Sequence, residues 1–128
     1  MSITVKVNGG PSATVAYTSN MNAQQALEGA YAAINNDKQF TYGLQYYGLT
    51  FGYLVFMING TFDSNMPSAA PYYYWEFFVN GIPATKGIDN TILKDRDVVS
   101  FAFNVYTPGP SASPMLTAKH EHATKPKV

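Results

Sequence analysis

The chain has 128 residues, enough for one domain with its own apolar core but too few for two domains of ordinary size. Its formal net charge is +0 and only 12% of its residues are charged, so no global field favours nucleic acid, an anionic membrane or a charged substrate. The absence of cysteine excludes disulfides, thiolate catalysis and thiolate metal ligands. Aromatic residues reach 15%, and ten of them are Tyr, which predicts surfaces that favour contact over solvation.

The first residues alternate apolar and polar side chains. Ile3, Val5 and Val7 precede the turn sequence NGGP, and the alternation resumes at Ala13 and Val15, which predicts an opening β-hairpin. The same stretch lacks the basic start and apolar run of a secretory signal, so we recognise no signal peptide in this chain. No apolar stretch is long enough to span a bilayer, and we expect no membrane insertion.

A helix is predicted over residues 23–34. Its apolar positions fall at helical spacing, at Ala23, Ala26, Leu27, Ala30, Tyr31 and Ile34. Asn22 precedes the pattern and Gln25 stands three residues later, which matches a capping box. The sequence NND at 35–37 ends the helix.

The chain from residue 40 to residue 106 reads as strands and turns. Segments 40–47 and 51–58 are rich in β-formers, and the glycines within them mark bulges or close approaches of another segment. Two Asn-Gly pairs, at 59–60 and 80–81, predict hairpin turns. The segment 61–71 is a loop, and 97–106 is the last strand of the fold.

The composition changes at Thr107. Residues 107–128 hold four prolines, three lysines and both histidines, and they cannot form a core of their own. We divide the chain into a β-grasp domain, 1–106, and a Pro/Lys-rich tail, 107–128. The tail is expected to be flexible, or to be ordered by the surface of a partner. The predicted fold is therefore α+β, a β-grasp-like mixed sheet with a single packed helix and a C-terminal extended tail.

Several short motifs stand in a fixed order along the chain. They are Ala-Leu-Glu at 26–28, Tyr-Trp at 74–75, Asn-Gly at 80–81, Gly-Ile-Asp at 87–89, and Leu-x-Asp-x-Asp at 93–97 before the last strand. This set resembles the carboxyl-terminal β-grasp domain of transcobalamin and intrinsic factor, which also occurs in bacterial surface proteins. The resemblance covers residues 3–106 and implies the fold.

The resemblance has two limits. In the vitamin carriers this domain closes over cobalamin together with a large helical domain, which has no counterpart in these 128 residues. A cobalamin-like ligand is therefore the alternative that the resemblance implies, and not the leading prediction. The family turn is usually Asp-Gly-Asp, and Arg96 occupies the glycine position here, so the backbone must suit a residue with a side chain.

The segment from Tyr72 to Phe78 places six aromatic rings in seven consecutive positions. Alternation along a strand puts Trp75 and Phe77 on one side, which we expect to pack on the helix. The other side, here called the Tyr72 face, consists of Tyr72, Tyr74, Glu76 and Phe78. Each ring buries on the order of 150–250 Å², so the open rings would exceed the apolar patch that a soluble monomer tolerates. Either the glycine-rich middle of the chain or a second molecule must cover this face.

The leading prediction is a non-enzymatic protein-binding or self-assembly module, a component of a surface, filament or virion assembly. It would dock through the Tyr72 face and the tail onto protein subunits, in a homo-oligomer or a larger assembly, at an extracellular surface or in a virion. The alternative is a binding domain for a small molecule, cobalamin-like or flat and apolar. The candidate contact residues are Tyr72, Tyr74, Glu76, Phe78, Tyr47 and Tyr53.

No catalytic motif is found, and we expect neither enzymatic activity nor a cofactor. The one catalytic candidate is Glu76, which burial would make a conceivable acid or base. Pairing with Lys6 or Lys38, or exposure at a sheet edge, is the preferred interpretation of Glu76. His120 and His122 could bind a metal weakly, but a solvated segment is favoured, and no metal site is predicted. The aspartates around Arg96 are interpreted as turn chemistry.

Overall fold

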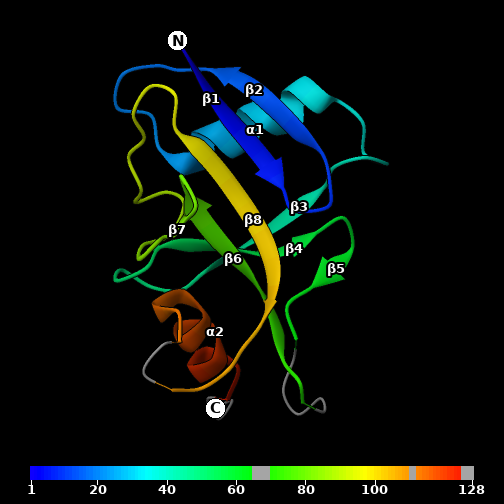
Figure 1. Ribbon diagram of the computed structural model, residues 1–128, viewed down its shortest axis with the longest axis vertical. Coiled ribbons are helices and arrows are strands. Elements are labelled where there is room, and N and C mark those ends of the chain that lie inside the picture. Colours follow the sequence, from blue (N-terminus) through cyan, green and yellow to red (C-terminus); the bar gives the residue numbers. More distant parts are fainter. Residues whose placement is uncertain (65–69, 110–111, 125–128) are drawn as a thin grey trace.

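The computed structural model describes residues 1–64, 70–109 and 112–124, with side chains up to residue 121. It is an α+β fold of two sheets and two helices (Figure 1), which confirms the predicted fold class. The elements in chain order are β1 (Ser2–Val7), β2 (Ser12–Ala16), α1 (Ala23–Ile34), β3 (Tyr42–Tyr46), β4 (Tyr53–Ile58), β5 (Thr61–Phe62), β6 (Tyr73–Val79), β7 (Ile82–Pro83), β8 (Val98–Val105) and α2 (Pro114–Thr124).

The main sheet has the strand order β2-β1-β8-β6-β7. Strands β1 and β8 pair in parallel, with Val5 opposite Val99, whereas the other neighbours are antiparallel. The sheet is therefore mixed, as predicted, and the opening hairpin and the last strand are confirmed. Trp75 of β6 stands opposite Phe103 of β8, so the aromatic strand lies inside the sheet.

Helix α1 begins and ends as the sequence predicts. The Asn22 side chain accepts a hydrogen bond from Gln25 N at 2.8 Å, and the Gln25 side chain accepts one from Asn22 N at 2.9 Å. The helix ends at Asn35, whose backbone is left-handed with φ of 48°. Its small apolar side chains, Ala23, Ala26, Leu27 and Ala30, are buried, because the helix packs closely on β1 and β2 (Figure 1).

Strands β3, β4 and β5 form a second, antiparallel sheet, where the sequence suggested a single sheet. The pairing of β3 with β4 shifts register next to Gly43. A Cβ atom at Gly43 would come within 2.8 Å of the Phe56 ring, and one at Gly52 within 2.3 Å of the Asp89 carboxylate. The predicted bulge is therefore confirmed at Gly43, whereas the close neighbour of Gly52 is a side chain and not the backbone of another segment.

One apolar core joins the two sheets and α1. Its fully enclosed members include Ile3, Leu27, Phe40, Leu54, Ile58, Ile88, Leu93, Val99 and Phe101. The Trp75 side of β6 faces this core, and its indole Nε1 donates to Thr61 O of β5 at 2.9 Å. The small sheet therefore covers part of the Trp75 side, which was predicted to pack on the helix.

The C-terminal segment differs from the predicted extended tail, and α1 is not the single packed helix. Residues 114–124, near the end of the chain, form α2, which packs on β6 (Figure 1). Met115, Leu116 and Lys119 are 1%, 5% and 1% exposed. The sequence offers too few apolar anchors to predict this helix, because its third buried residue is a lysine. Within the described ranges, no helix is long and apolar enough to cross a membrane.

Candidate binding site

The Tyr72 face is covered by the protein's own C-terminal helix. Tyr74 and Glu76 are 1% and 6% exposed, while Tyr72 and Phe78 are half-buried. The Tyr74 hydroxyl lies 3.0 Å from His120 Nδ1, and the rings of Tyr72 and His120 are 5.4 Å apart. Helix α2 thus supplies cover that the sequence did not predict. Tyr74 and Glu76 are enclosed in this structure, whereas Phe78 lines a different surface together with Lys6 and Ser100.

His120 is not the solvated residue that the sequence suggested. Its ring stacks on Tyr106 at a centroid distance of 4.4 Å and meets Tyr74 edge-on. The helical turn of α2 carries it into this aromatic cluster, which a proline-rich composition does not reveal. His122 lies beyond the described side chains. Among the described residues, no group of three or more His, Asp or Glu side chains could hold a metal ion.

Glu76 is buried, and the preferred interpretation of this residue is wrong. Its Oε1 accepts a hydrogen bond from Asn104 Nδ2 at 2.8 Å, across the pair of strands β6 and β8. The lysine whose pKa the Glu76 charge raises is Lys119, not Lys6 or Lys38. Because Lys119 belongs to a helix outside the sheet, strand pairing alone could not identify it as a neighbour of Glu76.

A buried ion pair fastens α2 to both sheets. Lys119 Nζ donates to Val55 O of β4 at 2.6 Å and to Trp75 O of β6 at 2.7 Å, and it lies 2.9 Å from Asp63 Oδ2. Burial lowers the pKa of Lys119, against the opposing effect of the Asp63 carboxylate. Burial likewise raises the pKa of Asp63, against the effect of the Lys119 charge. We call Asp63, Lys119 and these two carbonyls the Lys119 junction.

The two remaining predicted contact residues, Tyr47 and Tyr53, lie in different places. Tyr47 is half-buried, and burial, followed by the charges of Asp63 and Tyr74, raises its pKa well above the usual value. Tyr53 is 39% exposed and packs its ring on Tyr46 at 5.0 Å. The structure therefore gathers Tyr47 with Tyr72, Tyr74 and Glu76 beside α2, but places Tyr53 elsewhere.

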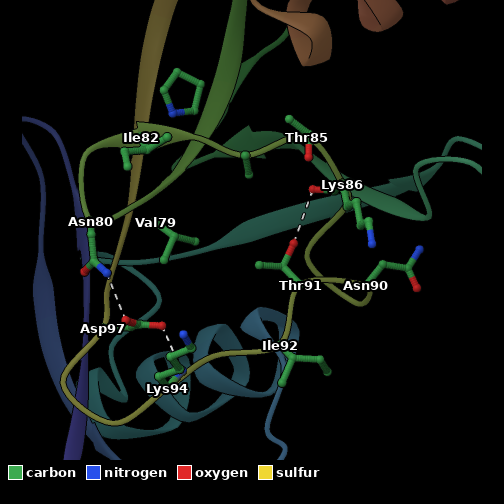
Figure 2. A pocket seen from close by; sticks show the side chains of 12 residues that line it. Val79, Asn80, Ile82, Thr85, Lys86, Asn90, Thr91, Ile92, Lys94 and Asp97 are labelled. Atoms are coloured by element: carbon green, nitrogen blue, oxygen red, sulfur yellow. Dashed lines mark hydrogen bonds between the residues drawn. The ribbon is translucent and has the colours of Figure 1, made fainter.

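An open groove lies beside the β6–β7 hairpin, where the sequence predicted no site (Figure 2). Its volume is about 580 Å³. We call it the 79–97 groove, and its walls are formed by Val79, Asn80, Ile82, Pro83, Ala84, Thr85, Lys86, Asn90, Thr91, Ile92, Lys94 and Asp97. The only sequence signal for it is that several of the family motifs fall within this range.

Hydrogen bonds fix one side of the groove (Figure 2). Asn80 Nδ2 donates to Asp97 Oδ1 at 2.9 Å, and Lys94 N donates to Asp97 Oδ2 at 2.8 Å. Val98 N donates to Asn80 Oδ1 at 2.8 Å. Arg96 has φ of 72°, so the turn keeps the left-handed backbone of the usual glycine and bears a side chain there. Asp97 acts in turn chemistry, as predicted, whereas Asp95 Oδ1 accepts a hydrogen bond from Ser2 N of β1 at 2.9 Å.

The other side is tied to α1 and β4. Asn22 Nδ2 donates to Asp89 O at 3.2 Å, Ile88 N donates to Tyr53 O at 2.9 Å, and Thr91 Oγ1 donates to Gly87 O at 2.9 Å. The first two bonds join segments that are distant in sequence, and the third closes a local turn. The backbone of the groove is therefore preorganised by the fold itself.

The groove combines apolar and cationic side chains. Ile82 and Ile92 are 69% and 60% exposed, and Lys86 and Lys94 are exposed as well. The one carboxylate, Asp97, already accepts hydrogen bonds through both of its oxygens. The arrangement suits a ligand with an apolar body and oxygen acceptors, and it holds no pair of groups arranged for acid-base chemistry.

Residues 20–104 match the model of a protein family described as Domain of unknown function (DUF4430). No curated protein matches the chain. Among solved structures, haptocorrin in complex with Cbi is similar with a TM-score of 0.66 and 17% identity, over 84% of this chain and 25% of haptocorrin. A protein from Ruminococcus gnavus ATCC 29149, described as a "putative metal binding protein", has a TM-score of 0.54 and 11% identity, over 83% of this chain and 98% of its own. The chain thus spans about a quarter of the length of haptocorrin.

Proposed function

The chain belongs to the DUF4430 family, a transcobalamin-like domain family, and on this basis we propose that it is a non-enzymatic binding module whose small-molecule site is the 79–97 groove. This proposal replaces the Tyr72 face as the contact surface, because α2 encloses most of that face.

The observation that carries the proposal is the convergence of the family motifs on one preformed groove. Asn80 stands on one wall, the segment 87–89 supports the opposite wall, and Lys94 and Asp97 close the end. The volume of about 580 Å³ lies within the range of ordinary small-molecule sites. A hydrogen-bonded backbone that bears exposed side chains needs little rearrangement to bind a ligand.

The ligand class follows from the groove's chemistry. The two isoleucines offer apolar contact, and the two lysines favour carbonyl or phosphate oxygens. The likeness to haptocorrin, which was solved with Cbi, supports a cobalamin-like compound as the first to test. Since the chain spans 25% of that protein, we expect weaker binding than a complete carrier would give.

Equilibrium dialysis against a cobalamin-like corrinoid tests this function. Ile92→Glu places a carboxylate in the groove, and because Ile92 is 60% exposed, the variant should fold. We expect it to weaken binding at least about tenfold, which corresponds to about 1.4 kcal/mol. Leu49→Glu is the matched control, since Leu49 is 94% exposed and lies outside the groove. Equal loss in both variants, or no binding by the unmodified protein, would contradict the proposal for this ligand class.

A protein partner remains the second candidate, through a different surface from the one predicted. The small sheet and the turn before β4 expose Tyr46, Leu49 and Phe62, at 49%, 94% and 57%. Light scattering across a wide concentration range tests self-assembly. A rising mass that Leu49→Glu abolishes would support it, and a constant monomer mass would exclude self-assembly under those conditions.

A further inference from the structure

The Lys119 junction places three oxygen atoms around Nζ, which is the number that the three N–H bonds of an ammonium need. The Lys119 side chain is 1% exposed, and its Nζ donates to two backbone carbonyls, Val55 O and Trp75 O. A neutral amine has two N–H bonds and one lone pair. The two carbonyls can therefore hold both N–H bonds of a neutral Lys119, and the lone pair is left for the third neighbour, Asp63, whose Oδ2 is 2.9 Å from Nζ.

The two oxygens of Asp63 are in different environments. Oδ1 accepts a hydrogen bond from Trp75 N at 2.7 Å. Oδ2 is buried and lies 2.9 Å from Lys119 Nζ, and among the described residues no backbone N–H donates to it. A backbone N–H at a carboxyl oxygen is the arrangement that stabilises negative charge when a nucleophile adds to the carbon. Oδ2, which has no such donor, is then the oxygen positioned to leave.

Burial disfavours the charged forms of both groups. It lowers the pKa of Lys119 and raises the pKa of Asp63, while the charge of each group opposes the shift of the other. Because Nζ and Oδ2 are 2.9 Å apart, transfer of one proton from nitrogen to oxygen converts the ion pair into an amine that faces a carboxylic acid.

We propose that Lys119 and Asp63 condense spontaneously into an amide bond between their side chains. Lys119 Nζ attacks Asp63 Cγ, the Cγ–Nζ bond forms, and the Cγ–Oδ2 bond breaks. Starting from the amine and the carboxylic acid, one proton passes from Nζ to Oδ2, 2.9 Å away, and Oδ2 departs as water. No oxidant, reductant or further reactant is needed. The product ties α2 covalently to the segment after β5, and its remaining amide N–H can keep one of the two carbonyl bonds.

The intact mass of the purified full-length protein tests the bond directly. We expect a mass lower than that of the sequence by one water molecule. Lys119→Met and Asp63→Ala should show no such loss, and Lys86→Met, which changes an exposed lysine, should retain it. Asp63→Asn should lose one ammonia instead and give the same linkage.

Peptide mapping and the variants give further tests of the amide linkage between Lys119 and Asp63. A tryptic peptide that contains both Asp63 and Lys119, joined through their side chains, would establish the linkage. Ring closure between Asp63 and Ser64 would also release water, but it would persist in Lys119→Met, and that result would overturn the proposal. The full sequence mass in the folded, unmodified protein would overturn it without any variant.

Discussion

The Lys119 junction and the 79–97 groove both border strand β6, but polar side chains are buried in the junction and exposed in the groove. In the junction, Lys119 is 1% exposed and meets partners from its own chain. In the groove, Lys86 and Lys94 extend from the surface, and Ile92 is 60% exposed. Burying a charge is costly unless it is paired, so the junction serves to hold the chain together. Exposed groups on a rigid frame remain available to a ligand.

The largest effect should come from breaking the junction. Lys119→Met removes the partner of the buried Asp63 and of two backbone carbonyls, together with the proposed amide bond, and we expect a loss of at least about 3–5 kcal/mol in the free energy of unfolding. Urea denaturation measures it. Lys86→Met, an exposed lysine in the groove, should change stability by less than about 0.5 kcal/mol. Similar values for the two variants would contradict the contrast between the regions.

On the groove side, Asn22→Ala should cost about 1–2 kcal/mol, because Asn22 caps α1 and also donates to Asp89 O. The same variant should weaken ligand binding, since Asp89 supports the groove wall. Gln24→Ala is the control on the same helix, because the Gln24 side chain makes an exposed hydrogen bond to Glu28 at 3.3 Å, and alanine keeps the backbone bond from residue 24 to Ile88 O. An unchanged affinity in Asn22→Ala would show that the cap and the groove are independent.

On the junction side, Tyr74→Phe should cost about 1 kcal/mol, since it removes the hydrogen bond to His120. It should also change the response to alkaline pH. Burial raises the pKa of Tyr74 from 10.0 to about 12, so the folded protein holds this proton more tightly than the unfolded chain. The stability that Tyr74 contributes is complete below pH 10 and is lost as pH rises toward 12. Urea midpoints across this range should fall less steeply in Tyr74→Phe than in the unmodified protein.

The smallest effect concerns the turn that closes the groove. Arg96 has φ of 72° and a side chain that is 90% exposed, with one long contact of 3.9 Å to Asp95. Glycine adopts this backbone without steric cost, so Arg96→Gly should stabilise the protein by about 0.5 kcal/mol. Arg96→Ala, which keeps the strain, should not. Thermal unfolding of the two variants separates backbone strain from the loss of the guanidinium.

The local elements could be predicted from the sequence because their signals are local. Asn22 and Gln25 define the start of α1, and the Asn-Gly turns and alternating strands follow their usual patterns. Helix α2 could not be predicted, since Lys119 occupies a core position and a lysine indicates solvent unless its partners are known. Those partners, Asp63 and two backbone carbonyls, come together only in three dimensions.

The proposed groove could not be predicted for a related reason. The density of rings in 72–78 directed the prediction to the Tyr72 face, where Tyr74 and Glu76 are enclosed. The groove residues give no periodic signal, because Asn80 and Asp97 belong to different turns and meet only through the pairing of β6 with β8. What the sequence did contain was the order of the family motifs, and these segments frame the groove.

Hydrogen exchange in the presence and absence of a cobalamin-like corrinoid tests the contrast most directly. We predict that the ligand slows exchange in segments 80–86 and 90–97, while 72–76 and α2 stay as slow as they are in the free protein. Slower exchange at 72–76, accompanied by faster exchange in α2, would mean that the helix gives way to the ligand. That result would contradict the assignment of the groove as the binding site and of the junction as a permanent fastening.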